Sequence, residues 1–252
     1  MNIDIEKLKN IARDAGNAIM KIYGEDDFAV EYKSDESPLT AADKASHQVI
    51  VTGLEKHFPD IPILSEEGAD ISYAERKNWQ RFWLVDPLDG TKEFIKRNGE
   101  FTVNIALIQE GRPVIGVVYV PVQDKMYFGS SEGGCWTQEA GDKPQQIQVR
   151  QPDHEAGLTV VMSRSHPSPE LEEYLKGVKI AEALPVGSSL KLCVVAEGLA
   201  DIYPRLGPTM EWDTAAGHAV AEAAGAKVMT PEGVPLVYNK ENLLNPYFIV
   251  SA

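Results

Sequence analysis

The stretch Trp83-Leu84-Val85-Asp86-Pro87-Leu88-Asp89-Gly90-Thr91 joins a run of large apolar residues to two aspartates. The apolar run predicts a buried strand that ends at Asp86. Pro87 fixes its own φ angle and biases Asp86 towards an extended conformation. Asp86 and Asp89 then occupy the two ends of a four-residue turn, so both carboxylates and the Leu88 carbonyl can face one side of it.

Oxygen ligands gather in this turn at a density that suits Mg²⁺, which prefers carboxylates, carbonyls and substrate phosphate to a complete protein cage. Gly90 and Thr91 follow, and they predict a helical turn whose free backbone N–H groups can bind an anion. Carboxylates for a metal beside amides for a phosphate are what a metal-dependent phosphatase needs. Asp-Pro and Asp-Gly are also common in ordinary turns, so the stretch alone does not decide the function.

Two further acidic segments are predicted at a strand end or a helix start, where binding groups usually lie. Glu66 and Glu67 follow the apolar residues of 61–64, and Asp213 follows Trp212 ahead of an alanine-rich helix. A Glu-Glu pair is often a solvated loop, and an aspartate in this place often only caps its helix. Taken singly, neither segment establishes a metal site.

Apolar periodicity predicts a mixed protein of helices and strands in layers. The first helix ends at Gly24, and the second begins with a capping box of Thr40 and Asp43. Glu110-Gly111-Arg112 predicts a tight hairpin between two strands. The predicted helices cover 5–22, 40–57, 169–175, 188–197 and 214–224, and the predicted strands cover 61–64, 82–86, 101–108, 114–120, 125–128 and 158–162.

A polar, glutamine-rich composition over 137–157 predicts a boundary between two lobes of one structural unit. Residues 1–150 form the N-terminal α+β lobe, which carries most of the acidic candidates. Residues 151–252 form the C-terminal α/β lobe, which carries Asp213 and the basic candidates described below.

Composition excludes several classes of protein. The 252 residues are 43% hydrophobic and 25% charged, which is typical of a globular chain. With 24 basic and 38 acidic residues, the net charge of −14 disfavours binding to nucleic acid or to anionic lipid. The longest apolar stretch, 113–122, is too short to span a bilayer. Two cysteines without a CxxC pattern indicate a reducing compartment, so we expect a cytoplasmic protein.

Asp86-Pro-Leu-Asp-Gly-Thr91, with Glu66-Glu67 and Trp212-Asp-Thr-Ala-Ala216 in this order, resembles the inositol monophosphatase-type phosphatases, which depend on magnesium and are sensitive to lithium. The resemblance covers essentially the whole chain and implies a layered αβαβα sandwich. Within this superfamily, 89–95 is similar to the 3′(2′),5′-bisphosphate nucleotidases, because inositol monophosphatases typically have Asn-Phe where this chain has Glu93-Phe94.

The nucleotidase resemblance implies a phosphoric monoester hydrolase that removes the 3′-phosphate of 3′-phosphoadenosine 5′-phosphate (PAP), giving AMP and phosphate during sulfate assimilation. Whether the sulfated analogue PAPS is a second substrate stays open at this point. It also favours a monomer whose partner is a small nucleotide, and it allows loose association with the inner face of the bacterial membrane.

The resemblance implies at least two Mg²⁺ ions that activate a water molecule for in-line attack on phosphorus. One ion is held by Glu66, Asp86 and the Leu88 carbonyl. The other is held by Asp86, Asp89 and Asp213, so that Asp86 bridges the two.

Three residues have catalytic roles by the same resemblance. Thr91, oriented by Asp43, positions or deprotonates the attacking water, with help from Glu66. The amides of Gly90 and Thr91 bind the phosphate that is removed. Asp43 fits its capping role with Thr40 equally well.

A bisphosphate carries a second phosphate, which must be bound away from the metals. Serine hydroxyls, amides at a helix start and basic side chains suit phosphate oxygens. The nucleotidases resemble this chain in having a His, then Ser-x-x-Lys, then an Arg. The candidate substrate contacts are Glu66, Leu88, Asp89, Gly90, Thr91, His166, Ser188, Lys191, Arg205 and Asp213.

Two alternatives remain open. The first is an inositol or sugar phosphate phosphatase that uses the same metals. The second is a protein without catalytic activity that binds divalent cations or nucleotides.

Overall fold

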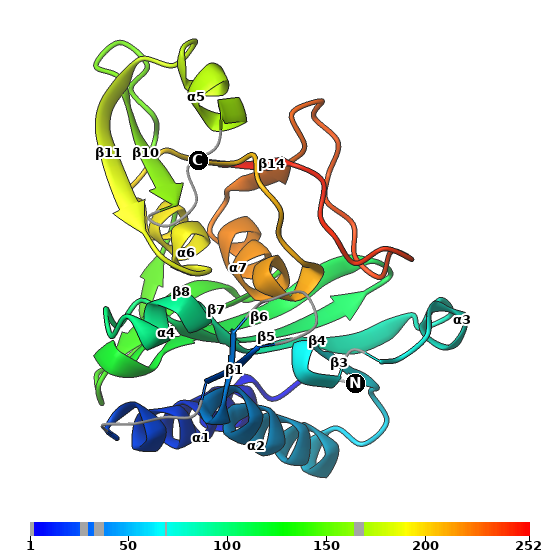
Figure 1. The fold of residues 1–252 in the computed structure, drawn as a ribbon. Coiled ribbons are helices and arrows are strands. Elements are labelled where there is room, and N and C mark those ends of the chain that lie inside the picture. Colours follow the sequence, from blue (N-terminus) through cyan, green and yellow to red (C-terminus); the bar gives the residue numbers. More distant parts are fainter. Residues whose placement is uncertain (1–2, 26–29, 33–37, 69, 164–168) are drawn as a thin grey trace.

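A computed structural model of the chain describes residues 3–25, 30–32, 38–68, 70–163 and 169–252. A helix pair covers one face of a seven-stranded sheet, and two central helices separate that sheet from a five-stranded one (Figure 1). The short helix α5 (Pro169–Leu175) lies at the far end beside the second sheet. The predicted mixed α+β class and the layered sandwich are confirmed.

The helix pair consists of α1 (Ile5–Tyr23) and α2 (Ala41–His57), which confirms both predicted helices. The capping box is also present, because the Thr40 amide donates to Asp43 Oδ2 at 2.7 Å and the Thr40 hydroxyl accepts from the amide of Ala42 at 3.2 Å. A short antiparallel pair joins the helices: β1 (Val30–Tyr32) and β2 (Pro38–Thr40).

The seven strands of the first sheet lie in chain order, and only the first pair is parallel. The predicted hairpin is confirmed, since Glu110 and Gly111 both have positive φ angles between two paired strands. The strands are β3 (Ile63–Ser65), β4 (Arg81–Asp89), β5 (Thr102–Gln109), β6 (Arg112–Val120), β7 (Lys125–Ser130), β8 (Gly134–Glu139) and β9 (Gln145–Ile147).

Both faces of the first sheet are buried, which explains the continuous apolar runs of its central strands. Trp83 and Val85 of β4 pack towards α1 and α2, whereas Phe82 and Leu84 pack towards the central helices. Side chains of a strand alternate between faces, so one strand contributes to both cores.

The prediction that the strand ends at Asp86 is wrong. β4 continues to Asp89, and Asp86 pairs with Asn104 while Asp89 pairs with Thr102. Three steps along β4 therefore match two steps along β5, which is a β-bulge rather than a separate turn. Gly90 then adopts a φ of 93° and leads into α4 (Thr91–Ile95).

The second half of the chain supplies both central helices, α6 (Leu190–Ala196) and α7 (Glu211–Ala223). The predicted helices are confirmed, although α7 begins three residues before the predicted start. The order of the second sheet is β11-β10-β12-β14-β13. Its strands are β10 (Leu158–Ser163), β11 (Ile180–Val186), β12 (Ile202–Arg205), β13 (Lys227–Met229) and β14 (Phe248–Ser251).

Helix α7 lies very close to the first sheet. A β-carbon added to Gly116 of β6 would come within 2.2 Å of the Ala216 carbonyl oxygen, so this approach requires glycine. Because α7 of the second half packs on the sheet of the first half, the division into two lobes near residue 150 stays a prediction. No helix in the described ranges has the length and apolar character needed to cross a membrane.

Candidate active site

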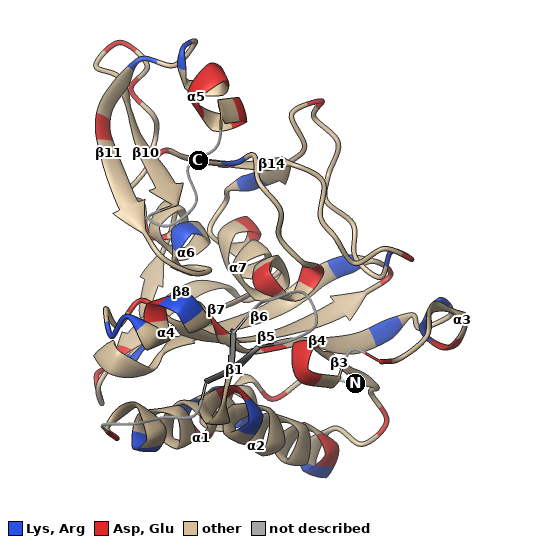
Figure 2. Cartoon of the chain, viewed as in Figure 1, with Lys and Arg blue, Asp and Glu red and all other residues tan. Residues whose placement is uncertain are grey.

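A cavity of about 680 Å³ opens where the first sheet meets α6 and α7. Its walls come from β4, α4, the central helices, β12 and the short 3₁₀ turn η1 (Glu66–Gly68). Figure 2 shows acidic ribbon at η1 and on α7, and basic ribbon on α6. Most of the predicted site residues line it: Glu66, Asp86, Leu88, Asp89, Gly90, Thr91, Ser188, Lys191, Arg205 and Asp213.

Two predicted residues are placed differently. Asp43 lies behind the cavity wall, where its carboxylate contacts Thr91. His166 lies outside the described residues.

Four of the acidic side chains that line the cavity, Glu66, Asp86, Asp89 and Asp213, come from η1, β4 and α7, which are far apart in sequence. Burial raises the pKa of Asp86 and Asp213 well above the usual carboxyl value, and neighbouring carboxylates raise it further. Burial also raises the pKa of Asp89, to about 6, although nearby Lys191 opposes this shift. Such a cluster favours either protons or a bound cation.

Backbone amides orient the three aspartates. Asp86 Oδ1 accepts from the Leu88 amide at 3.0 Å, Asp89 Oδ2 from the Ser189 amide at 2.5 Å, and Asp213 Oδ2 from the Met210 amide at 2.9 Å. Among the described residues these bonds use one oxygen of each carboxylate, which leaves the other for a cation.

The donor set fits a hard divalent cation, because it consists of carboxylates and the Leu88 carbonyl without sulfur or imidazole. Within the described ranges, no three acidic, histidine or cysteine side chains converge as a preformed cage. Such an open arrangement suits a cation like Mg²⁺, which completes its coordination with water and substrate oxygens.

A hydroxyl-carboxylate pair lies beside this cluster. Thr91 Oγ1 lies 3.3 Å from Asp43 Oδ1 and 3.5 Å from the Leu88 carbonyl oxygen. Asp43 Oδ2 accepts from both the amide and the hydroxyl of Thr40, so one carboxylate caps α2 and also orients Thr91. Burial raises the pKa of Asp43 to about 6, which leaves it mainly ionised at neutral pH.

Basic groups line the same cavity close to Asp89, and we call this part of it the basic wall. The Lys191 side chain is largely buried and donates to the Ser188 carbonyl, and burial lowers its pKa to about 8. Ser188 has a φ of 44°, an uncommon conformation that is often found at functional sites. Arg205 Nη2 donates to the Pro208 carbonyl at 2.7 Å.

The residues that support Asp89 were not predicted. The amide of Ser189 binds Asp89, while its hydroxyl lies 2.9 Å from Asn104 Oδ1 and 2.8 Å from Thr102 Oγ1. Thr102 and Asn104 are buried polar residues two positions apart on one face of β5, where Ala106 and Ile108 continue the row. Two polar residues in an otherwise apolar row were the sequence signal that could have predicted this support for Asp89.

This arrangement of buried carboxylates, a helix start and basic side chains defines the site of a metal-dependent phosphatase. The sequence profile of the inositol monophosphatase family matches residues 4–247, and the chain belongs to this family.

Individual members of this family are similar to the chain over nearly its full length. Over 249 residues, which are 98% of this chain and 99% of the relative, the sequence is 55% identical to 3′(2′),5′-bisphosphate nucleotidase CysQ of Escherichia coli K12. A crystal structure of CysQ from Bacteroides thetaiotaomicron superposes with a TM-score of 0.86 at 44% identity, covering 98% of this chain and 96% of that one. Inositol monophosphatase from Anabaena superposes with a TM-score of 0.76 at 25% identity, covering 98% and 89%.

Proposed function

We propose that this protein is a Mg²⁺-dependent 3′(2′),5′-bisphosphate nucleotidase that converts PAP to AMP and phosphate, with PAPS as a second substrate. The observation that carries the proposal is the pairing of acidic and basic walls in one cavity. A substrate with two phosphates suits such a site, because one phosphate binds at the metal side and the other at Lys191 and Arg205. The near-full-length similarity to CysQ supports the same substrate.

Two Mg²⁺ ions would be held by Glu66, Asp86 and the Leu88 carbonyl on one side, and by Asp86, Asp89 and Asp213 on the other. When bound, they lower the pKa of water and neutralise the charge that develops on the phosphoryl and leaving oxygens. The second oxygen of each aspartate is available for this role.

The protein's own groups then position the water and the phosphate. The Thr91 hydroxyl donates a hydrogen bond to the ionised Asp43, so a lone pair of Oγ1 is directed to accept a hydrogen bond from the attacking water. Glu66 is a further acceptor at the same wall. The left-handed backbone of Gly90 starts α4 and directs the amides of Gly90 and Thr91 towards the phosphate that is removed.

The nucleotide is oriented at the basic wall. Ser188, Lys191 and Arg205 would bind the 5′-phosphate with charge-assisted hydrogen bonds, and His166 would contribute from outside the described part of the chain. Because Lys191 is buried, its interaction with phosphate is weakly screened by solvent and salt.

Phosphate release from PAP, inositol 1-phosphate and fructose 1,6-bisphosphate tests this function, with Mg²⁺ or with EDTA. We expect fast Mg²⁺-dependent release from PAP alone. Lys191→Ala and Arg205→Ala should raise KM for PAP at least tenfold while sparing residual activity on inositol 1-phosphate. Equal losses on both substrates would favour the inositol phosphatase alternative, and Mg²⁺ binding without any release would favour the non-catalytic one.

We also infer action in the cytoplasm, as a monomer that recycles PAP during sulfate assimilation. Both cysteines, Cys135 and Cys193, are buried free thiols, which suits a reducing compartment. Co-sedimentation with anionic vesicles tests its association with the inner face of the membrane.

A further inference from the structure

A short segment of the C-terminal region, Asn239 to Glu241, is held between two buried side chains of opposite charge. Arg76 of α3 (Tyr73–Arg76) is 3% exposed, and Glu211 at the first position of α7 is fully buried. Burial of a charge is costly unless hydrogen bonds compensate it, so each side chain must be matched by nearby partners.

Arg76 binds the carbonyl side of the segment. Its Nη1 donates to Asn239 Oδ1 at 2.9 Å and to the Lys240 carbonyl at 2.7 Å, and its Nη2 donates to the Glu241 carbonyl at 2.9 Å. Asn239 Nδ2 donates in return to the Arg76 carbonyl at 2.8 Å. Asn239 has a φ of 71°, so these contacts hold an uncommon backbone conformation.

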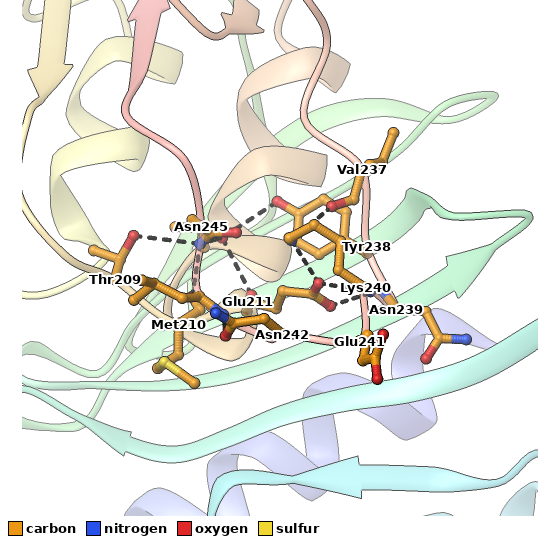
Figure 3. A network of polar contacts seen from close by, with 12 residues as sticks. Thr209, Met210, Glu211, Val237, Tyr238, Asn239, Lys240, Glu241, Asn242 and Asn245 are labelled. Carbon is orange, nitrogen blue, oxygen red and sulfur yellow. Dashed lines mark hydrogen bonds and ion pairs between the residues drawn. The ribbon is translucent and has the colours of Figure 1, made fainter. Parts of the chain in front are cut away.

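Glu211 binds the amide side of the same segment, as Figure 3 shows. Its Oε2 accepts from the Asn239 amide at 2.7 Å. Its Oε1 accepts from the Lys240 amide at 3.0 Å and from Lys240 Nζ at 2.5 Å. Together, Arg76, Glu211, Asn239 and Lys240 form what we call the α7 clamp.

The clamp acts at the point where α7 presents Asp213 to the cavity. Asp213 is two residues after Glu211, and its Oδ2 accepts from the Met210 amide. Asn245 Nδ2 in turn donates to the Met210 carbonyl at 2.8 Å (Figure 3). The backbone that orients the Asp213 carboxylate is therefore fixed from both sides by the segment of residues 239–245.

The clamp also connects two segments that carry acidic candidates. Arg76 belongs to the segment that follows η1 and its Glu66, whereas Glu211 belongs to α7. From this geometry we infer that Glu211, held through residues 239–240 by Arg76, is a positioning residue that fixes Asp213 relative to Glu66 and so sets the affinity for the divalent cation. This inference rests on the proposed function, in which Asp213 is a metal ligand.

Glu211→Gln tests the inference. Each oxygen of Glu211 accepts from a backbone amide, and the NH₂ group of glutamine would replace one of these acceptors with a donor, so one hydrogen bond to residues 239–240 would be lost. The purified full chain is titrated with Mg²⁺ alone, and fitting the logarithmic rise in Tm gives the apparent dissociation constant, which is the Mg²⁺ concentration of half-saturation (the Mg²⁺ midpoint). We expect this concentration to rise about tenfold, as is usual when a group that orients a metal ligand is lost. At saturating Mg²⁺, KM for PAP should stay unchanged.

Asp201→Asn is the matched control. Asp201 is also a buried carboxylate that accepts from a backbone amide, that of Thr159 at 2.7 Å, and from a basic side chain, that of Arg150. It does not line the cavity, so its loss should lower Tm without changing the Mg²⁺ midpoint. If Glu211→Gln behaves like Asp201→Asn, the clamp is only structural and the inference is wrong.

Lys240→Met provides a milder variant if Glu211→Gln does not fold. It removes the Nζ contact with Glu211 and keeps both backbone contacts. We expect a smaller rise of the Mg²⁺ midpoint, and an unchanged midpoint would overturn the inference. These experiments measure Mg²⁺ binding and not catalysis. A wild-type protein that binds Mg²⁺ but releases no phosphate from PAP would therefore refute the proposed function without deciding the inference about Glu211.

Discussion

The Thr91 hydroxyl lies 3.3 Å from the carboxylate of Asp43, a residue 48 positions earlier in the chain. The same carboxylate accepts two hydrogen bonds from Thr40 and closes the start of α2. The cap of α2 and the contact with Thr91 therefore share one side chain, and this explains why both interpretations of Asp43 fitted the sequence.

Thr91→Val should remove the group that orients the water while keeping the size of the side chain. We expect kcat to fall by about 10²–10⁴, the usual contribution of a positioned proton acceptor. Thr91→Ser should retain most activity. If Asp43 acts through Thr91, adding Asp43→Asn to Thr91→Val should lower kcat little further, and additive losses in this double-mutant cycle would contradict the pairing.

Asp86→Asn should abolish phosphate release and at the same time stabilise the protein without metal. The carboxylate of Asp86 is buried near other carboxylates, so its ionised form is disfavoured, whereas asparagine can still accept from the Leu88 amide. We expect a higher Tm in EDTA and no gain from Mg²⁺. A variant that keeps turnover would contradict the bridging role. Lithium should inhibit the wild type by competing at one Mg²⁺ position, and full activity in lithium would count against the roles inferred from the family resemblance.

The stability contributed by Asp89 should depend on pH when metal is absent. Its pKa is about 6 in the folded protein and 3.8 as the ordinary value, so the folded state binds the proton more tightly and loses stability as pH rises between these values. As pH rises from 4 to 7, the unfolding free energy of the wild type should fall relative to that of Asp89→Asn, by on the order of 3 kcal/mol. Urea unfolding in EDTA measures this difference, and Mg²⁺ should abolish it. A constant difference would show that the folded environment leaves the Asp89 pKa unchanged.

Gly116→Ala should destabilise the protein because α7 leaves no room for a β-carbon. The nearest atom, at 2.2 Å, is a backbone oxygen that cannot rotate away, so we expect a loss of about 1–3 kcal/mol. Gly177→Ala is the control, since its nearest neighbour lies at 3.8 Å. Urea unfolding of both variants compares them, and an equal cost would argue against close packing of α7.

Local patterns predicted the elements that bury their own apolar faces. The two N-terminal helices, the central strands and the hairpin at Glu110 follow from periodicity and turn chemistry. Strand β9 was missed because it is polar and lies at the sheet edge, and β8 was missed because it is short and mixes polar with apolar residues. The β-bulge at Asp86 was taken for a turn, because the pairing that defines a bulge involves β5 and is not encoded locally.

The candidate site was predicted as a set of residues but not as a supported structure. The acidic motifs identified Asp86, Asp89 and Asp213, since their order and spacing resemble a known family. Ser189 and Glu211 support two of these aspartates through contacts with residues 28 to 100 positions away. Such contacts exist only after the sheets have packed, so no local pattern predicts them.

The last strand, β14, lies inside the second sheet between β12 and β13. A chain emerging from the ribosome therefore cannot complete this sheet until the residues of β14, Phe248–Ser251, are free of the exit tunnel. Until then, the segment of residues 239–245 has no fixed anchor on its C-terminal side. Assembly of the candidate site consequently has to wait for β14, and a nascent chain that stops before β14 would carry Glu66, Asp86, Asp89 and Asp213 without the packed sheet that supports them.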